Sequence, residues 1–309
     1  MCGIVGIISN NHNASAVIFE GLKKLEYRGY DSWGIAVKNG RDVAVEKHIG
    51  KIGNASISLP ESHIGIGHTR WATHGGVTEK NAHPHSDCSK KIVVVHNGIV
   101  ENYQELKNNL HKKHHFSSET DTEIIAHLIE EKIENYSFTE AVLDTFALLM
   151  GSNAIVVFDI ESETIMACRN GSPLVVGLGN DELFLGSDVT PFLSYTNRVV
   201  FLNDGEAAYL KKNNATFYNT DTKKEIQKEH EQIDWQAEDA EKKGFPHYMI
   251  KEIMEQTKTI ENAVVQNKDR IVEVAESLTK ANTIGLIGCG TAYYACLFGQ
   301  YFFAQNNIQ

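Results

Sequence analysis

The chain has 309 residues, 42% of them hydrophobic and 22% charged, which excludes wholesale disorder and allows about two domains. Lys and Arg number 29 against 40 Asp and Glu, and the net charge of −11 argues against nucleic-acid binding. The apolar runs are far shorter than the roughly 20 residues of a membrane span, so no membrane partner is predicted. Five scattered cysteines, and a start without the features of a signal peptide, predict a cytoplasmic protein.

Residues 3–150 predict strands followed by a block of helices. Asn13 is placed to cap the first helix, and Thr120 with Glu123 forms a capping-box pattern before the third. The predicted helices cover 14–25, about 102–113, a run that begins at TDTE, and 139–150. Runs rich in Val and Ile predict strands at 3–9, 34–38, 43–48, 63–69 and 92–96.

Residues 153–229 consist instead of short strand patterns separated by Gly, Asn and Asp turns. Because strands and helices come in blocks and do not alternate, the chain favours an α+β fold over a doubly wound one. Its sheets should pack together with helices outside. The predicted strands are 153–159, 164–169, 173–178, 181–187, 198–202 and 206–210.

A domain boundary is predicted near residue 240. The stretch 211–246 is rich in Lys, Glu, Asp and Gln, and is interpreted as a hairpin leading into an exposed linker. Residues 247–278 have a helical pattern. Residues 283–305 predict a strand, a glycine turn and a helix, the opening βα unit of a second, truncated α/β domain. Its GCGT turn resembles a phosphate-binding loop, although the match is short.

Cys2 is the first candidate for chemistry. Removal of Met1 would leave its thiol on the same residue as a free α-amine of pKa about 7.7–8.0, which is an internal general base. A strand beginning at Gly3 would fix this nucleophile at a strand end. The alternative is an ordinary cysteine near an ordinary start.

Residues 67–85, GHTRWATHGGVTEKNAHPH, are dense in polar and aromatic side chains. The histidine spacing matches no familiar motif such as CxxC or HExxH, so no metal site is predicted. Arg70 lies just beyond a strand and suits a carboxylate or phosphate, and Trp71 suits a pocket wall. For each histidine, a purely structural loop is the alternative.

Asn97, Gly98 and Asp121 complete the candidates. An Asn amide and the next N–H can converge on one developing oxyanion, although a hairpin turn is the more frequent role of Asn-Gly alone. Asp121 offers a carboxylate to an ammonium group, or stabilises the first turn of its helix. With Cys2 and Arg70, these residues suit a site that holds both ends of an amino acid and attacks its side-chain amide, as glutamine hydrolysis requires.

Several motifs, in this order, resemble those of class II glutamine amidotransferases, the family with an N-terminal nucleophile: MCGIVG, LEYRGYDS, GHTRWATHG, NAHPH, HNGIVENY, SETDTE and GSPLVVGLG. LEYRGYDS, FPHYMIKEIMEQ and GCGTAYYA more narrowly resemble the glutamine–fructose-6-phosphate aminotransferase (isomerizing) branch. The resemblance implies a four-layer αββα sandwich in residues 1–240. A helical linker and an incomplete sugar-isomerase domain would then occupy 241–309.

The resemblance also implies a role for each motif residue. Cys2 would be the nucleophile, and Asn97 with Gly98 the oxyanion hole. The substrate L-glutamine would meet the remaining residues, with no cofactor or metal: Arg70, Thr73 and His74 at its carboxylate, Asp121 at its ammonium, Trp71 gating the ammonia, and Arg28 in support.

Whole enzymes of this branch pass ammonia to fructose 6-phosphate to make glucosamine 6-phosphate. Most of the isomerase half is absent here, so glutamine hydrolysis alone is expected, and a homodimer through that half stays open. The chain departs from the family pattern at four positions, which are Trp33, Val77, Thr257 and Ala292. Three rivals remain: a purine-pathway or asparagine-forming amidotransferase, a non-catalytic glutamine-binding module, and a histidine-rich metal-binding domain.

Overall fold

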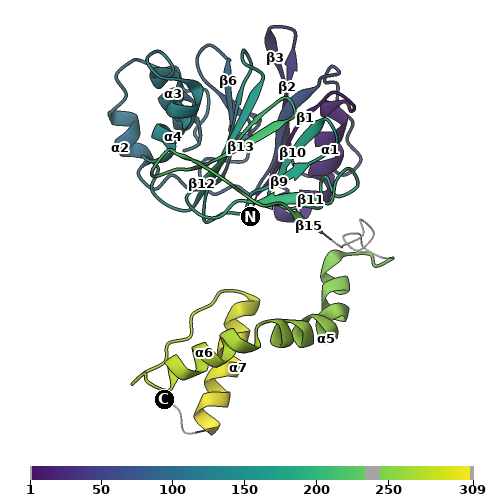
Figure 1. Ribbon diagram of the computed structural model, residues 1–309, viewed down its shortest axis with the longest axis vertical. Coiled ribbons are helices and arrows are strands. Elements are labelled where there is room, and N and C mark those ends of the chain that lie inside the picture. Colours follow the sequence, from purple (N-terminus) through teal and green to yellow (C-terminus); the bar gives the residue numbers. More distant parts are fainter. Residues whose placement is uncertain (1, 234–243, 307–309) are drawn as a thin grey trace. The chain divides into compact units, whose positions relative to one another are not determined.

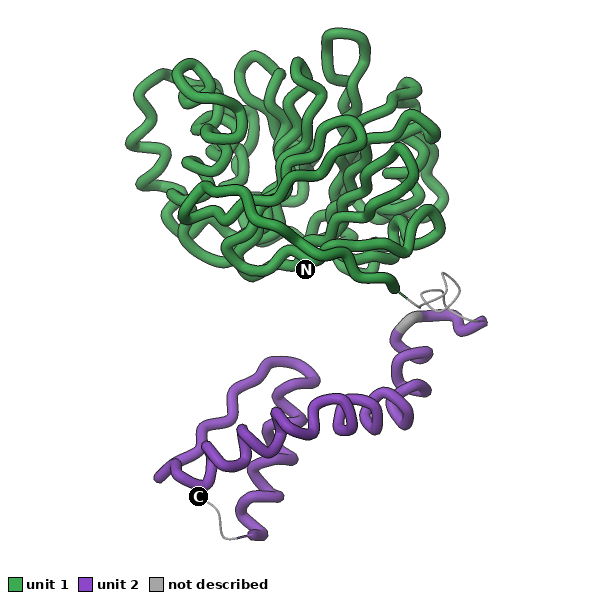
Figure 2. Tube along the Cα trace, viewed as in Figure 1, with its two compact units in different colours: residues 1–240 green, residues 241–309 purple. Residues whose placement is uncertain are grey.

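The computed structural model describes residues 2–233 and 244–306. The chain forms two compact units, residues 1–240 and 241–309 (Figure 2). In the described ranges, all strands belong to the first unit, and the second unit is helical.

Two antiparallel sheets form the centre of the first unit (Figure 1). One has eight strands in the order β15-β11-β9-β10-β1-β4-β2-β3, and the other has seven in the order β14-β13-β12-β8-β7-β6-β5. The strand bounds are β1 Gly3–Ser9, β2 Ser32–Asn39, β3 Asp42–Ile49, β4 Ile64–Arg70, β5 His85–Ser86, β6 Ile92–Gly98, β7 Asn153–Asp159, β8 Thr164–Asn170, β9 Val175–Leu178, β10 Glu182–Gly186, β11 Arg198–Phe201, β12 Glu206–Lys211, β13 Asn214–Asn219, β14 Glu225–Ile226 and β15 Glu231–Gln232.

The two sheets pack face to face around a common apolar core. Ile4 and Ile66 enter it from the eight-stranded sheet, and Val95 and Val156 from the seven-stranded sheet. The strands that carry these residues are buried along almost their whole length, because helices cover the opposite faces. Removal of this apolar surface from water is the main driving force for the sandwich.

Helices complete the four layers. α1 packs on the eight-stranded sheet through Ile18 and Leu22, while α3 and α4 pack on the seven-stranded sheet through Ile125 and Val142 (Figure 1). The expected α+β class and αββα layering are therefore confirmed. The helix bounds are α1 Ala14–Leu25, α2 Tyr103–Asn108, α3 Glu123–Lys132 and α4 Phe138–Phe146, with short 3₁₀ turns at Glu26–Arg28 and Glu79–Asn81.

The predicted cap of the first helix is confirmed, since Asn13 Oδ1 accepts a hydrogen bond from Ser15 N–H at 3.1 Å. The capping box predicted for Thr120 and Glu123 is wrong. α3 begins at Glu123, and the Glu123 carboxylate accepts the N–H groups of Ser117 and Ser118, each at 2.7 Å. This carboxylate therefore orders the chain before the helix.

The hairpin predicted within the stretch 211–246 is confirmed, whereas the exposed linker expected after it begins later than the composition indicates. Residues 206–219 form the β12–β13 hairpin, and β15 pairs with β11 through Arg198 and Gln232. Strands at the border of a sheet are often polar, which explains why their composition resembles that of a linker. Residues 234–243, which include the expected boundary, lie outside the described residues.

The second unit contains α5 (Tyr248–Gln266), α6 (Lys268–Leu278) and α7 (Thr291–Gln305). The helical prediction for 247–278 is confirmed. The strand predicted at 283–287 is wrong, because no described strand lies beside it to complete its hydrogen bonds. Among the helices of the described ranges, none has both the length and the apolarity that a bilayer crossing requires.

Trp33, one of the departures from the family pattern, is a core residue. Its side chain is 1% exposed on β2, which pairs it with Thr69 of β4. The indole stacks on His48 with ring centroids 4.5 Å apart and lies 5.7 Å from Phe19. Trp33 therefore fills the space between the sheet and α1.

Gly67 lies on β4 beneath α1, where a methyl group has no room. An ideal Cβ would lie 2.4 Å from Ile18 Cγ2 and 3.0 Å from Leu22 Cδ1. We expect Gly67→Ala to lower the free energy of unfolding by about 1–3 kcal/mol, the usual cost of overpacking. Gly6→Ala is the matched control, because its nearest neighbour would be 3.4 Å away. Urea denaturation that finds equal stability for the two variants would contradict the close approach of α1.

Candidate active site

Several strand ends meet at one end of the sandwich. Gly3 at the start of β1 pairs with Thr69 near the end of β4, and its N–H donates to Thr69 Oγ1 at 3.1 Å. This register places Cys2 beside Arg70. The last residues of β6 approach the same point, because Asn97 Nδ2 donates to the Cys2 carbonyl oxygen at 3.1 Å.

A cavity of about 420 Å³ opens at these strand ends. Most of the predicted site residues line it, namely Cys2, Arg28, Trp71, Thr73, Asn97 and Gly98. The cavity is also lined by five residues without a predicted role, namely Ile99, Glu101, Ser152, Ser172 and Pro173. Three predicted residues lie outside this lining, namely Arg70, His74 and Asp121.

The thiol of Cys2 lies beside the backbone of Trp71. Trp71 N–H donates to Cys2 Sγ at 3.2 Å. Burial raises the pKa of the thiol above its ordinary value; the Trp71 hydrogen bond and the Arg70 guanidinium lower that pKa to a smaller extent, and the Asp31 carboxylate raises it. The thiol is therefore protonated at neutral pH and requires a base to become a nucleophilic thiolate.

The amide of Asn97 is held from both sides. Its Nδ2 donates to the Cys2 carbonyl at 3.1 Å and to Ser187 Oγ at 2.9 Å, and its Oδ1 lies 3.0 Å from His68 Nε2. These contacts fix which side of the amide faces the cavity. One N–H of the Asn97 amide therefore points to Cys2 and the other to Ser187.

His68 acts here as a neutral hydrogen-bond donor. Burial lowers the pKa of His68 to about 3. The hydrogen bonds to Asn97 and to the His96 carbonyl raise this pKa, but by less than burial lowers it. Both partners of Nε2 are oxygen acceptors at 3.0 Å, so Nε2 carries the proton. From the sequence, His68 is only one of several histidines in the segment 67–85 and has no predicted role of its own.

Gly98 occupies a position that other residues cannot take. Asn97 and Gly98 pair with β7 as the end of β6, which excludes the alternative of a tight hairpin turn. The φ angle of Gly98 is +149°, and a Cβ there would lie 2.2 Å from Ser152 O and 2.7 Å from His96 Nε2. Only glycine can therefore occupy this last position of β6, beside the cavity.

Arg70 and Asp121 are buried and already have backbone partners. The Arg70 guanidinium donates to the carbonyl oxygens of residues 74–76 at 2.5, 3.2 and 3.1 Å, which orders that loop. Asp121 Oδ2 accepts from Val100 N–H at 2.6 Å. Burial lowers the pKa of Arg70, and the negative charges of its neighbours, Asp121 among them, oppose that effect. The two opposite charges are thus close enough to interact.

Trp71 and Arg28 lie at the wall of the cavity. Trp71 is 44% exposed, and its ring centroid is 5.4 Å from that of Tyr30. Arg28 Nη1 is 3.5 Å from Asp188 Oδ2, and the buried Arg28 Nε has no hydrogen-bond partner in the described part of the chain.

Two supporting residues have no signal in the sequence spacing. Ser187 Oγ accepts from both Ile4 N–H and Asn97 Nδ2, although 90 residues separate it from Asn97. Asp31 accepts from Ala72 N–H at 2.8 Å and thereby fixes the chain after Trp71. Asp31 belongs to the YRGYDS motif, but its partner follows only from the folded loop.

The comparisons with known proteins agree with this geometry. A family model described as a glutamine amidotransferase domain matches residues 68–194. The glutamine–fructose-6-phosphate aminotransferase (isomerizing) of Thermococcus kodakarensis is 47% identical over 99% of this chain, and that of Pyrococcus horikoshii is 48% identical over 97%. The solved glutamine phosphoribosylpyrophosphate amidotransferase from B. subtilis shares the fold, with 24% identity over 71% of this chain and 49% of that chain and a TM-score of 0.61.

The chain contains a glutamine amidotransferase domain. The expected family and its N-terminal-nucleophile type of fold are therefore confirmed. The chain spans about half the length of the curated relatives it matches, 52% and 51% for the two archaeal proteins.

Buried histidines make the stability of this amidotransferase domain depend on pH. Burial lowers the pKa values of His68, His83, His85 and His96, to about 3 for His68, against about 6.5 in an unfolded chain. Below pH 6.5 the unfolded state therefore binds more protons than the folded state. Each such histidine then costs up to about 1.4 kcal/mol of stability per pH unit.

We therefore expect the free energy of unfolding to be highest at pH 7.5, where these histidines are neutral in both states, and to fall by several kcal/mol by pH 5. Urea denaturation across this range measures the slope. His83→Phe should reduce the slope, whereas loss of the exposed His111 should leave it unchanged. A pH-independent stability would mean that these rings are not buried in neutral form.

Proposed function

We propose that this chain hydrolyses L-glutamine to glutamate and ammonia through a thioester on Cys2. The observation that carries the proposal is the meeting of Cys2 and the Asn97 amide in one cavity, with Asn97 Nδ2 held 3.1 Å from the Cys2 carbonyl. A thiol with neighbouring oriented N–H donors is the minimum that acyl transfer requires.

In the first step, Cys2 Sγ attacks the side-chain amide carbon, and the thiol proton passes to the α-amine that removal of Met1 would free. The carbonyl oxygen becomes an oxyanion, to which Gly98 N–H and Asn97 Nδ2–H donate. The Asn97 N–H that donates to the Cys2 carbonyl would donate to the oxyanion instead, while the other N–H keeps its hydrogen bond to Ser187. The C–N bond breaks, the amine returns the proton, and ammonia leaves.

In the second step, water attacks the thioester carbonyl carbon. The α-amine of Cys2 takes a proton from this water, and the same donors hold the second oxyanion. The C–S bond breaks, the thiolate regains the proton, and glutamate leaves. The raised pKa of the Cys2 thiol supports the need for such a local base in both steps.

We assign the backbone end of glutamine to the charged pair beside the cavity. Arg70, with Thr73 and His74, would bind the α-carboxylate, and Asp121 the α-ammonium. A guanidinium has five N–H donors, so the bonds from Arg70 to residues 74–76 leave donors for a carboxylate. Arg28 would support this end of the cavity, and Trp71, at its exposed wall, would gate the ammonia.

We further propose that, in the complete enzyme, the ammonia is transferred to fructose 6-phosphate. This reaction would form glucosamine 6-phosphate in the cytoplasm. The names of relatives 47% and 48% identical support this branch over the phosphoribosylpyrophosphate amidotransferases, at 24% identity. Residues 241–309 would then begin the sugar-isomerase domain, through which a homodimer would form. The cysteines are all free, as a reducing compartment requires.

Cys2→Ala should abolish glutamate release while leaving the fold intact, because water cannot replace the thiolate as nucleophile. Cys289→Ser, which removes an exposed thiol of the second unit, is the matched control and should retain full turnover. Mass spectrometry of the active protein should show that Met1 has been removed. Turnover by Cys2→Ala at the wild-type rate would contradict the covalent mechanism.

Asn97→Ala should lower kcat by about 10²–10³ with little change in KM, the usual result when one preorganised oxyanion donor is removed. Asn97→Asp keeps the shape of the side chain without its donors and should show the same loss. Asn11→Ala, at an exposed asparagine, should behave as wild type. A change confined to KM would assign Asn97 to binding of the ground state.

A further inference from the structure

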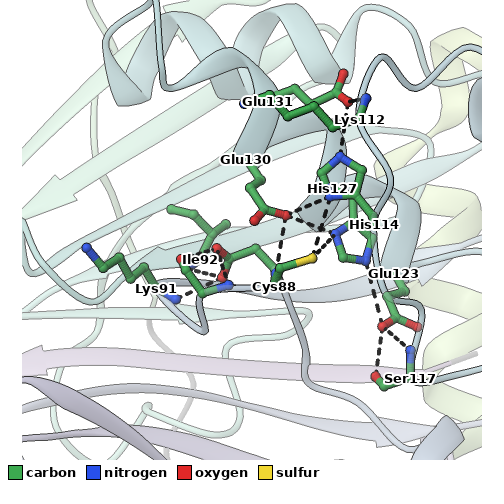
Figure 3. A network of polar contacts seen from close by, with 12 residues as sticks. Cys88, Lys91, Ile92, Lys112, His114, Ser117, Glu123, His127, Glu130 and Glu131 are labelled. Carbon is green, nitrogen blue, oxygen red and sulfur yellow. Dashed lines mark hydrogen bonds and ion pairs between the residues drawn. The ribbon is translucent and has the colours of Figure 1, made fainter.

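A second polar cluster lies on the helical side of the seven-stranded sheet, and none of its members lines the cavity of Cys2 (Figure 3). Cys88 comes from the turn between β5 and β6, and His114 from the connection between α2 and α3. His127 and Glu130 lie one turn apart on α3. The potential ligand atoms of these four residues all lie within 4.8 Å of one another.

The distances within the cluster resemble those around a tetrahedral metal ion. Glu130 Oε2 lies 3.0 Å from His114 Nδ1 and 3.1 Å from His127 Nδ1. Cys88 Sγ lies 3.6 and 3.8 Å from the same two nitrogens. A tetrahedral ion with bonds of about 2.0–2.3 Å has ligand atoms about 3.3–3.7 Å apart. These four distances thus lie within a few tenths of an ångström of tetrahedral spacing, and the other two distances between the ligand atoms are at most 4.8 Å.

The outer nitrogens of both rings face carboxylates, an arrangement typical of metal-binding histidines. His114 Nε2 lies 3.0 Å from Glu131 Oε1, and His127 Nε2 lies 3.9 Å from Glu123 Oε1. At His114 the carboxylate holds the proton on Nε2 and leaves the Nδ1 lone pair free for a cation. His127 Nε2 faces its carboxylate at a longer distance and has no hydrogen-bond partner among the described residues. Figure 3 shows both Nδ1 atoms turned toward Glu130 and Cys88.

The charges of the cluster also favour a bound cation. Three carboxylates, those of Glu123, Glu130 and Glu131, surround two rings whose side chains are 3% and 0% exposed. Glu123 is buried and the other two carboxylates are half-buried, and so many acidic groups close together favour a compensating positive charge, which a divalent ion provides at one point. Cys88 is exposed and leaves an entry path for the ion.

We propose that Cys88, His114, His127 and Glu130 bind one zinc ion. A thiolate, two imidazoles and a carboxylate form a borderline-soft donor set that suits zinc better than magnesium or calcium. All four positions of a tetrahedron are filled by protein groups, so the site is structural and leaves no position for a substrate. The proposal does not depend on the glutaminase activity.

The ion would connect three segments that surround the active site. The Cys88 turn leads directly into β6, which ends at Asn97 and Gly98, and α3 begins two residues after Asp121. The connection that carries His114 has little regular structure of its own. Zinc would therefore fix this connection and hold α3 against the start of β6.

The purified full chain tests this proposal by metal analysis. Wild type, after dialysis without chelator, should contain one zinc per chain, and Cys88→Ser should lose it because an alcohol is a poor zinc ligand. Cys289→Ser and His111→Ala are the matched controls and should keep the metal. Circular dichroism verifies that Cys88→Ser is folded, since Cys88 is exposed.

Two further measurements make the result decisive. Zinc added to chelator-treated wild type should raise the melting temperature, and should not do so for Cys88→Ser. Glu131→Gln should weaken zinc binding by about 10- to 100-fold, as loss of an outer-shell carboxylate does elsewhere. A wild type that takes up no zinc, or a folded Cys88→Ser that keeps it in full, would overturn the proposal and leave a metal-free hydrogen-bonded cluster.

Discussion

The face-to-face packing of the two sheets is the constraint on which the candidate site depends. Apolar residues such as Ile4, Ile66 and Val95 must meet in one core, and this fixes the positions of β1, β4 and β6 relative to one another. Once the strands are fixed, Cys2 and Asn97 must emerge at the same end of the sandwich. The position of the candidate site is thus a consequence of how the core is filled.

Burial also decides the chemical state of the groups beneath the site. Because His68 is fully buried, it stays neutral and presents one donor and one acceptor, and its donor orients the Asn97 amide. An imidazolium there would cost the energy of an unsolvated charge. The same desolvation that costs stability in acid therefore supplies a fixed hydrogen-bond direction at neutral pH.

The sequence is informative where a residue's function depends on its neighbours along the chain, and silent where it depends on tertiary contacts. Alternating or continuous apolar runs predicted most strands, and Asn13 was identifiable as a cap from its place before an apolar helix. Ser187 and the Cys88 cluster were not predictable, because their partners lie far away along the chain. The Thr120 capping box failed since Glu123 found a better set of donors in the preceding loop.

The environment of Cys2 links the fold to the need for an internal base. Burial in the cavity raises the thiol pKa, and the nearby Arg70 charge and Trp71 N–H do not offset it. A low-pKa thiolate of the kind found beside a histidine in other thiol enzymes is therefore not available here.

His68 cannot take the proton from the Cys2 thiol, because the lone pair of His68 is on Nδ1 while its Nε2–H faces Asn97. A base on the nucleophile itself removes this difficulty, since the α-amine of residue 2 has a pKa near neutrality and moves with the thiol. In the mechanism proposed above, the burial that raises the thiol pKa thus makes release of that amine a condition for activity.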